Sequence, residues 1–596
     1  MFNPENNRVD YGKILTPPEG YELDFAVGTT YSLDLDAFIG ICMSLGLSTD
    51  TESTLFDNPL FMLDVLHKTS DKIALFCEGG QIHFPSKTTP LYSLLENSVY
   101  QVSVKKTKTA YPSFHPKFWL ISYVNDKRLK KYRVIVLSRN LTFDRSWDVV
   151  IALDGKKCDV ITDKNKPVKD FLSFLSDDIR SKHIGKNKIK KIQELISELD
   201  FIKFETEEKG FDDFDFIPLG IGDYSIKDYP LFGKEQYYEL FVMSPFLSKE
   251  TIKDLNRRWR KSDVRPLLFT RKESISGYSL EDCGNFDIYC MRDEVIDGDT
   301  EEENRKQQDI HAKLYMLRLN SKIDTELYLG SMNCSHNAMN GNIEFMIRLT
   351  CKRDYLNLKK LKQDLFCGDE GGAQNPFEKV DVDKIKIDTE EDENLDSVIK
   401  AICRSKTSAC VEQYGDKYNI VLETKYKQKI EDPQVMISPL FINDEQPLSE
   451  NIVFSGLSLK NLSRFYKISV KGKNKTVQRI IVIPTSGIPE NRDDAVISSI
   501  VPDTKSFYAY VSFVLGDNSV LGAMDAFRVL ENTDGGANTI NKIVNAALYE
   551  KMLKVAAINP EKLNGIEYLM KAVSNDGIIP DDFIKLYDTF QKAVKK

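Results

Sequence analysis

The side chains best suited to chemistry in this sequence lie between residues 311 and 344. His311 and Lys313 are separated by one residue, and Ser331 and Asn333 follow after a polar break. Side chains at positions i and i+2 of a strand share a face, so each pair should point in one direction. A histidine, a lysine and an asparagine that converge suit a phosphate diester. They supply a nucleophile or proton donor, a positive charge and an amide donor for the phosphate oxygens.

The same order of residue types occurs about 200 residues earlier in the chain. His115 and Lys117 are followed by a basic break and then by Ser138 and Asn140. A single histidine and lysine at this spacing would mean little, but two copies with the same downstream residues are a strong signal. The repeat predicts two copies of one fold that face each other.

Apolar runs on both sides of each polar break predict that each motif lies on a β-hairpin. An acidic residue opens the apolar run after each hairpin, Asp148 in the first copy and Glu344 in the second. A strand followed by a helix is expected at the start of each copy, at residues 20–46 and 238–262. Alternating strands and helices of this kind predict an α/β fold.

The paired motifs resemble the phospholipase D superfamily, whose signature is His-x-Lys followed by Gly-Ser-x-Asn in each half. Residues 330–333 match the second element fully, and residues 138–140 match it without the glycine. Most members carry an aspartate five residues after the lysine, where this chain has Ser122 and Arg318. In lacking it the chain is similar to the tyrosyl-DNA phosphodiesterase branch and some nucleases. The resemblance covers roughly residues 20–355.

The resemblance implies two pseudo-symmetric halves, each a mixed sheet flanked by helices. We expect the first half at residues 1–200 and the second at 201–377. A β-rich domain of unassigned role is expected at 378–520, because the runs at 418–422, 477–483, 496–501 and 508–514 are typical of strands. A helical region should follow at 521–596.

The resemblance also implies a two-step reaction that needs no metal or other cofactor. One histidine attacks phosphorus and forms a phosphohistidine, and the other protonates the leaving oxygen and then activates water. The family usually uses the histidine of the first half as nucleophile, here His115. The two imidazoles must then start in different protonation states, which predicts a bell-shaped pH profile.

The remaining roles follow from the same resemblance. Asp148 and Glu344 match acidic residues that orient a histidine, although each could also be a surface carboxylate at a strand edge. The groups expected to hold the phosphate oxygens are Lys117, Lys313, Asn140 and Asn333, and the supporting residues are Ser138, Asp148, Ser331 and Glu344.

Two basic segments could attract a nucleic acid, although the net charge of the chain is −9. The first lies on the hairpin between His115 and Asn140, whose tip we expect near the cleft, and the second lies on a helix that connects the halves. Both are candidate phosphate-backbone contacts, and the alternative is that both are ordinary solvated surface. Their residues are Lys127, Arg128, Lys130, Lys131, Lys186, Lys188, Lys190 and Lys191.

Composition limits the class of protein. With 596 residues, 41% hydrophobic and 29% charged, the chain should form several soluble domains. The ten cysteines include no Cys-x-x-Cys pair, which favours reduced thiols in the cytoplasm over disulfides or a zinc site. The first residues lack the pattern of a signal peptide. No run of about 18 apolar residues exists, so we expect no membrane span.

We therefore expect a phosphodiesterase, and specifically a metal-independent nuclease that acts on DNA in repair or in defence against foreign DNA such as phage. DNA is favoured over RNA as the nucleic-acid partner. The alternatives are a phospholipase or phosphatidyltransferase, and an inactive scaffold that binds nucleic acid. A helicase or another protein partner could bind through the C-terminal half.

Overall fold

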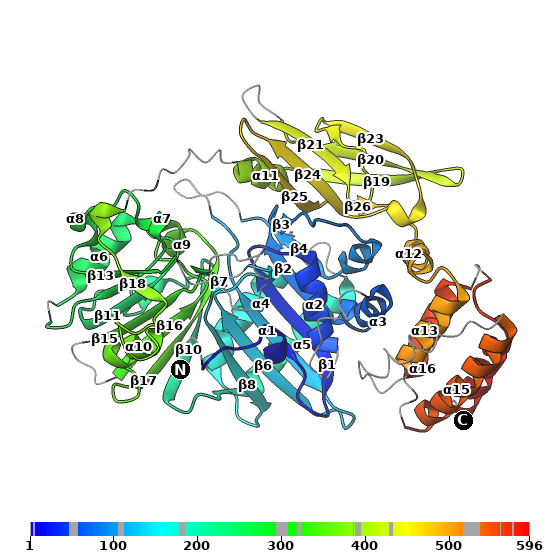
Figure 1. Ribbon diagram of the computed structural model, residues 1–596, viewed down its shortest axis with the longest axis horizontal. Coiled ribbons are helices and arrows are strands. Elements are labelled where there is room, and N and C mark those ends of the chain that lie inside the picture. Colours follow the sequence, from blue (N-terminus) through cyan, green and yellow to red (C-terminus); the bar gives the residue numbers. More distant parts are fainter. Residues whose placement is uncertain are drawn as a thin grey trace.

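The computed structural model describes most of the chain, and Figure 1 shows its arrangement. The described residues are 2–3, 6–46, 58–104, 112–144, 146–177, 185–260, 262–293, 308–319, 324–385, 387, 395–427, 433–515, 537–558, 560, 562–574 and 577–594. Two mixed sheets lie side by side in the blue-to-cyan and green parts of Figure 1. A yellow β-rich domain and an orange-to-red group of helices lie against the first of them.

The first half contains a seven-stranded sheet in the order β4-β2-β1-β5-β6-β8-β9. Its strands are β1 (Glu22–Thr30), β2 (Ile73–Glu78), β4 (Val99–Val102), β5 (Phe118–Val124), β6 (Lys130–Leu137), β8 (Val150–Lys157) and β9 (Ile202–Thr206). Its helices are α1 (Tyr11–Leu15), α2 (Leu35–Gly46), α3 (Pro59–Thr69), α4 (Lys166–Asp177) and α5 (Lys186–Glu198).

The second half contains an eight-stranded sheet in the order β10-β17-β16-β15-β11-β12-β13-β18. Its strands are β10 (Phe211–Leu219), β11 (Tyr237–Met243), β12 (Leu267–Phe269), β13 (Asp287–Met291), β15 (Leu314–Leu319), β16 (Asp324–Gly330), β17 (Glu344–Lys352) and β18 (Phe377–Lys379). Its helices are α6 (Lys249–Arg258), α7 (Lys272–Ile275), α8 (Leu280–Cys283), α9 (His336–Asn340) and α10 (Leu358–Leu365).

The two sheets share one topology at their centres, as the repeat predicted. β1 is parallel to β2 and antiparallel to β5, and β11 is parallel to β12 and antiparallel to β15 in the same way. Each motif lies on the antiparallel hairpin that follows, β5–β6 or β15–β16. Residues 320–323 of the second turn lie outside the described residues. The α/β class and the mixed sheets are therefore confirmed.

Apolar side chains from both sheets form one continuous core between the halves. Phe118 of β5 packs against Phe345 of β17, with ring centroids 4.4 Å apart. The chain segments also pair across the interface, because β7 (Ser146–Trp147) runs parallel to β14 (Asp309–Ile310) and Phe114 bridges to Ile343. These pairings hold the two motifs face to face.

The β-rich domain consists of two sheets, with strand orders β23-β20-β19-β26 and β22-β21-β24-β25-β3. The last strand of the second sheet, β3 (Ile82–His83), comes from the first half, so the domain is attached by strand pairing. Its own elements are α11 (Leu395–Arg404), β19 (Thr407–Tyr414), β20 (Lys417–Thr424), β21 (Gln434–Pro439), β22 (Gln446–Pro447), β23 (Asn451–Leu457), β24 (Phe465–Lys471), β25 (Thr476–Val482) and β26 (Thr485–Ser486).

The helical region begins earlier than we expected. The runs 496–501 and 508–514 were predicted as strands, but they belong to helices α12 (Arg492–Ile500) and α13 (Thr504–Val514). Every residue from Phe507 to Val514 is buried, and a short apolar run buried on all sides cannot be assigned to helix or strand by its periodicity. The remaining helices are α15 (Ala537–Ile558), α16 (Lys562–Ala572) and α17 (Asp581–Val594).

The helical region packs on the first half. Phe513 of α13 contacts Phe61 of α3, with ring centroids 4.0 Å apart, and Tyr568 of α16 stacks on His67 at 3.7 Å. Within the described ranges, no helix combines the length and the apolar character that crossing a membrane requires.

Candidate active site

The chemical residues of both motifs lie just outside the strands, not within them. His115 and Lys117 immediately precede β5, whereas Ser138 and Asn140 immediately follow β6. In the second half the same four types flank β15 and β16 at equivalent positions. Each set thus lies at the carboxyl end of the strand that pairs with its hairpin, β1 in the first half and β11 in the second. This is the edge of the sheet where α/β proteins collect functional groups.

Each histidine is hydrogen-bonded to a carboxylate from the opposite half. Nδ1 of His115 lies 2.8 Å from Oε2 of Glu344, and Nδ1 of His311 lies 2.9 Å from Oδ1 of Asp148. The backbone repeats this crossing, because the amides of His115 and His311 donate to the carbonyls of Ile343 and Trp147, both at 2.9 Å. Since Nδ1 is occupied, Nε2 is the nitrogen left for a substrate in both imidazoles.

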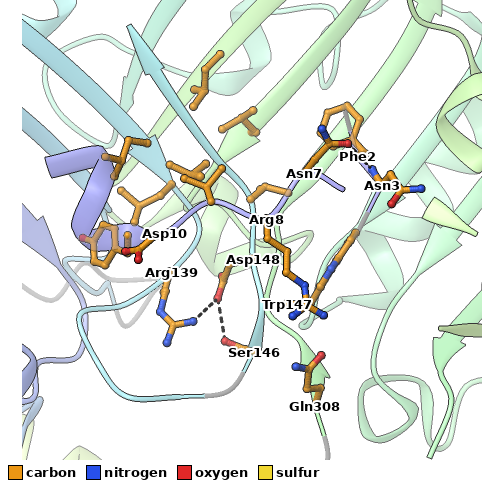
Figure 2. Close-up of a pocket in the computed structure, with 18 of the residues that line it drawn as sticks. Phe2, Asn3, Asn7, Arg8, Asp10, Arg139, Ser146, Trp147, Asp148 and Gln308 are labelled. Atoms are coloured by element: carbon orange, nitrogen blue, oxygen red, sulfur yellow. Dashed lines mark hydrogen bonds and ion pairs between the residues drawn. The ribbon is translucent and has the colours of Figure 1, made fainter. Parts of the chain in front are cut away.

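The two serines hold the carboxylates in place. Ser138 donates to Oδ1 of Asp148 at 2.7 Å and accepts the amide of Val149 at 3.0 Å. Ser331 donates to Oε2 of Glu344 in the same way. Asp148 also accepts a hydrogen bond from Ser146 at 2.8 Å and lies 3.8 Å from the guanidinium of Arg139, as Figure 2 shows. Both carboxylates are therefore fixed in orientation by their neighbours.

Both lysines are fully buried. Lys117 donates to the carbonyl of His115 at 3.0 Å, and Lys313 donates to that of His311 at 2.5 Å. Burial lowers the pKa of Lys117 to about 7. Burial, together with the charge of Lys117, holds the pKa of Lys313 well below its usual value. The positive charges of this site are thus destabilised while the site is empty, and a bound anion would stabilise them.

The pKa values of both histidines are also lowered. Burial lowers the pKa of His115 to about 4, although the carboxylate of Glu344 opposes the change. Burial and the charge of Lys313 lower the pKa of His311 to about 3. These lowered pKa values favour the neutral form of both imidazoles at pH 7. The expected mechanism needs one neutral and one protonated imidazole. A further negative charge, such as that of a bound phosphate, would raise the pKa of one histidine and allow this difference.

The two asparagines each leave one buried polar atom unpaired. Oδ1 of Asn140 and Oδ1 of Asn333 have no hydrogen-bond partner within the described part of the chain. A buried polar atom without a partner costs about 1–3 kcal/mol, so such atoms are usually paired. An amide oxygen only accepts, so these two atoms suit a donor group, whereas a contact with a phosphate oxygen requires the Nδ2 group of each asparagine.

Three aromatic side chains near the site had no motif to mark them. The ring of Tyr31, which follows β1, lies 5.0 Å from that of His115. Phe143, three residues after Asn140, is 65% exposed, and Phe246, after β11, is 51% exposed. Their positions directly after a strand or a catalytic motif were the only signal in the sequence.

A cavity of about 1620 Å³ lies behind Asp148, between the two halves and the N-terminal segment. Figure 2 shows some of the residues that line it, among them Asn7, Arg8, Arg139, Ser146 and Trp147. The histidines, lysines and asparagines of the two motifs are not among its lining residues. The candidate site is therefore distinct from this cavity, which it adjoins at Asp148.

The basic hairpin does not lie near the cleft, and this expectation is wrong. Thr29 at the end of β1 pairs with Phe118, whereas Glu22 at its start pairs with Val124, so the tip after Val124 lies at the opposite end of the sheet. Six strand residues separate these two levels by about 20 Å. Lys130 forms ion pairs there with Asp24 and Glu198, each at 2.9 Å.

The remaining basic residues also lie at this far end. Lys131 is placed over the ring of Tyr21 at 4.2 Å. Lys188 is 5% exposed and donates to backbone carbonyls, including that of Ile73 at 2.8 Å, at the start of β2. Lys191 pairs with Asp24 at 2.9 Å and Lys190 with Glu194 at 3.9 Å. The side chain of Lys186 lies outside the described residues, and no role is assigned by geometry to Lys127 or Arg128.

No group of three or more histidine, cysteine, aspartate or glutamate side chains in the described ranges is arranged to hold a metal ion. The ten cysteines are all free thiols.

Comparison with known proteins adds little to this geometry. No protein-family model and no curated protein matches the chain. Among solved structures, a polyphosphate kinase from Porphyromonas gingivalis matches with a TM-score of 0.31 and 12% identity, over 59% of this chain and 42% of that protein. The aligned part of this chain thus spans less than half of the kinase.

Proposed function

We propose that the protein is a phosphodiesterase of the phospholipase D type, and that it cleaves nucleic acid without a metal ion through a phosphohistidine. The observation that carries the proposal is the crossed pair of imidazoles, each held through Nδ1 by a carboxylate of the other half. The charges of the two buried lysines, Lys117 and Lys313, act on both imidazoles.

The reaction would proceed in two steps. Nε2 of His115 attacks phosphorus, and His311 gives its proton to the leaving oxygen. His311 then takes a proton from water, which attacks the phosphohistidine and releases the product. Lys117, Lys313 and the two asparagines stabilise the non-bridging oxygens as their charge grows. The choice of His115 as nucleophile comes from the family resemblance.

Nucleic acid is supported over lipid by an exposed aromatic ring beside a cationic group, and by a second exposed ring on a loop that an arginine holds. The guanidinium of Arg271 lies 5.5 Å from the ring of Phe246 and donates to the carbonyl of Ile310, next to His311, at 2.6 Å. Arg139 holds the loop that carries Phe143 by donating to the carbonyl of Thr142 at 3.3 Å. An aromatic ring with a cation at its side suits an unpaired base and its phosphate.

A direct test incubates the pure protein in EDTA with labelled single-stranded DNA, duplex DNA, RNA and phosphatidylcholine vesicles. We expect cleavage of a nucleic acid in chelator, with DNA preferred. After a denaturing alkaline quench and trimming of the nucleic acid, mass spectrometry should detect a His115 peptide that carries a nucleotide through a P–N bond. This adduct should be absent in His115→Ala, and its hydrolysis should be slowed in His311→Ala. Loss of all activity in EDTA with recovery in magnesium would contradict the mechanism, and preferential cleavage of the vesicles would favour the lipid alternative. A DNA-repair or defence role, cytoplasmic location and a helicase partner stay predictions.

A further inference from the structure

Helix α11 of the β-rich domain packs closely against the end of β2 in the first half. Gly80 follows β2 with φ +78°, and a Cβ there would lie 2.7 Å from Cγ2 of Ile399 on α11. A larger residue would thus collide with the helix in addition to being strained. Arg404, the last residue of α11, donates to the carbonyl of Pro112 at 3.0 Å. The helix therefore contacts the segment that leads into His115.

One side chain of α11 reaches further. Nζ of Lys400 donates to the hydroxyl of Tyr31 and to that of Ser113, both at 3.1 Å. It also lies 3.7 Å from a carboxylate oxygen of Glu78, a residue that is 1% exposed. Lys400 thus joins three elements of the first half: the end of β1, the end of β2 and the segment before His115.

Each of these three partners touches the surroundings of His115. Glu78 accepts the backbone amide of Phe114 at 2.6 Å, and the ring of Tyr31 lies against that of His115. Burial raises the pKa of Glu78 to about 7, while the charge of Lys400 opposes the rise. Without Lys400, Glu78 would be protonated at neutral pH and would hold the amide of Phe114 less firmly.

In the second half, Arg271 occupies the position that corresponds to Glu78. β2 and β12 occupy equivalent positions, with Phe76 beside Thr29 and Phe269 beside Met243, so Glu78 corresponds to Arg271. Arg271 donates to the carbonyl of Ile310 and pairs with Asp309 at 2.8 Å. The carbonyl before His311 is therefore held by a side chain of its own half, whereas the side chains that hold the segment before His115 contact a residue of the β-rich domain.

We propose that Lys400 is a positioning residue for His115, acting through Glu78, Tyr31 and Ser113, and that the first-half motif is complete only when the β-rich domain is docked. This inference rests on the proposed function for its catalytic consequence. It assigns the β-rich domain a direct part in the active site in place of a distant docking role.

The test compares Lys400→Met with Lys400→Arg in the full-length protein. The control is Asp396→Asn, which also changes a charge on α11 and removes an ion pair with Arg479, at 3.4 Å. Asp396 contacts none of Tyr31, Ser113 and Glu78, and its charge acts on Tyr31 only through space. We expect Lys400→Met to lower kcat about 10- to 100-fold, as for other groups that orient a catalytic side chain, with little change in KM. Lys400→Arg should recover most of the loss, and Asp396→Asn should stay within twofold of wild type, which is about 0.4 kcal/mol.

A second measurement does not depend on activity. Histidine labelled with 13C at Cε1 gives separate NMR signals for the imidazoles, and His115→Ala and His311→Ala assign two of them. Lys400→Met should shift the His115 signal and leave that of His311 in place, with an unchanged melting temperature as the check on folding. An unmoved His115 signal in a folded variant overturns the proposal. If the wild type cleaves no phosphodiester but the His115 signal moves, the positioning role holds and only the proposed function fails.

Discussion

The arrangement of charge around the two histidines depends on both halves at once. Glu344 lies in β17 and orients His115, whereas Asp148 lies before β8 and orients His311. Each carboxylate fixes the tautomer of its imidazole by accepting the proton of Nδ1, so that Nε2 carries the lone pair in the neutral ring. Neither half therefore contains a complete histidine site.

Replacing either carboxylate by its amide tests this crossing. We expect Asp148→Asn and Glu344→Gln each to reduce turnover by about 100-fold or more, because an amide can present its donor to Nδ1 and favour the wrong tautomer. Steady-state kinetics on a small chromogenic phosphodiester measures the effect. Glu326→Gln is the control, since Glu326 is buried like Glu344 but accepts from Tyr328 at 2.6 Å. Equal losses in the control would mean that the amides merely damage the fold.

The pH dependence of activity should lie on the acid side of the ordinary histidine range. The pKa values of His115 and His311 are lowered by burial to about 4 and about 3, so the free enzyme loses the proton of its general acid as pH rises above these values. Burial also lowers the pKa of Lys117 to about 7, which removes a positive charge at higher pH. Since kcat/KM reports the free enzyme, it should fall as pH rises above about 4 and fall further as pH passes about 7, where Lys117 loses its proton.

The pH profile of kcat at saturating substrate should lie higher than that of kcat/KM, because a bound phosphate favours the protonated imidazole. A chromogenic diester that stays singly charged over the whole range removes the titration of the substrate itself. A kcat/KM maximum at pH 7 or above would show that the histidines are not held neutral in the free enzyme.

At the scale of elements, hairpin length decides what lies near the site. The motif residues flank the open end of each hairpin, and seven residues of β5 carry the turn to the other end of the sheet. A charged tip on such a hairpin is thus remote from the motif residues in space, although it lies close to them in sequence. Lys130 of this hairpin instead pairs with Asp24 of β1 and Glu198 of α5.

Neutralising this tip should leave binding unchanged. In a variant with glutamine at Lys127, Arg128, Lys130 and Lys131, we expect the log-log salt slope of nucleic-acid binding to match that of the wild type, whereas each lost phosphate contact would change it by about 0.7 to 0.9. A salt titration of both proteins measures the slopes. Arg271→Gln, beside His311, is the comparison expected to reduce the slope. A flattened slope in the hairpin variant would place the nucleic acid across the far end of the sheet.

At the scale of the whole molecule, a buried ion pair attaches the helical region. Arg492 of α12 is 7% exposed in its side chain and lies 3.3 Å from Glu96, which is 1% exposed. Glu96 also accepts the hydroxyl of Ser463, and Arg492 donates to the carbonyl of Leu462 at 2.9 Å. Three parts of the chain thus meet at one pair of charges.

Breaking this pair should destabilise the protein. Arg492→Met leaves Glu96 buried without its partner, at a cost of about 3–5 kcal/mol. Removing both charges, with Glu96→Leu added, should recover most of that loss. Denaturant unfolding followed by near-ultraviolet circular dichroism measures it, and Lys571→Met, which breaks an exposed pair with Glu567, should change stability by less than about 1 kcal/mol. A double variant no more stable than Arg492→Met would mean that the pair is not the source of the effect.

The repeated motif in the sequence was enough to predict two facing halves, the hairpins that carry the motifs and the residues that converge. Those features depend on local periodicity and on the order of residue types, and both can be read from the amino-acid sequence. The strand character of 508–514 was misjudged because residues buried on every side have no periodicity to read.

Only the tertiary structure decided which carboxylate serves which histidine. Asp148 follows the motif of His115 in sequence, yet it binds His311, because the pairing of β7 with β14 brings the end of one half against the start of the other motif. The same holds for Lys400, which lies far from Tyr31 along the chain and meets it only through domain packing. Contacts between distant segments depend on how whole sheets and domains pack, and no spacing within the sequence encodes that arrangement.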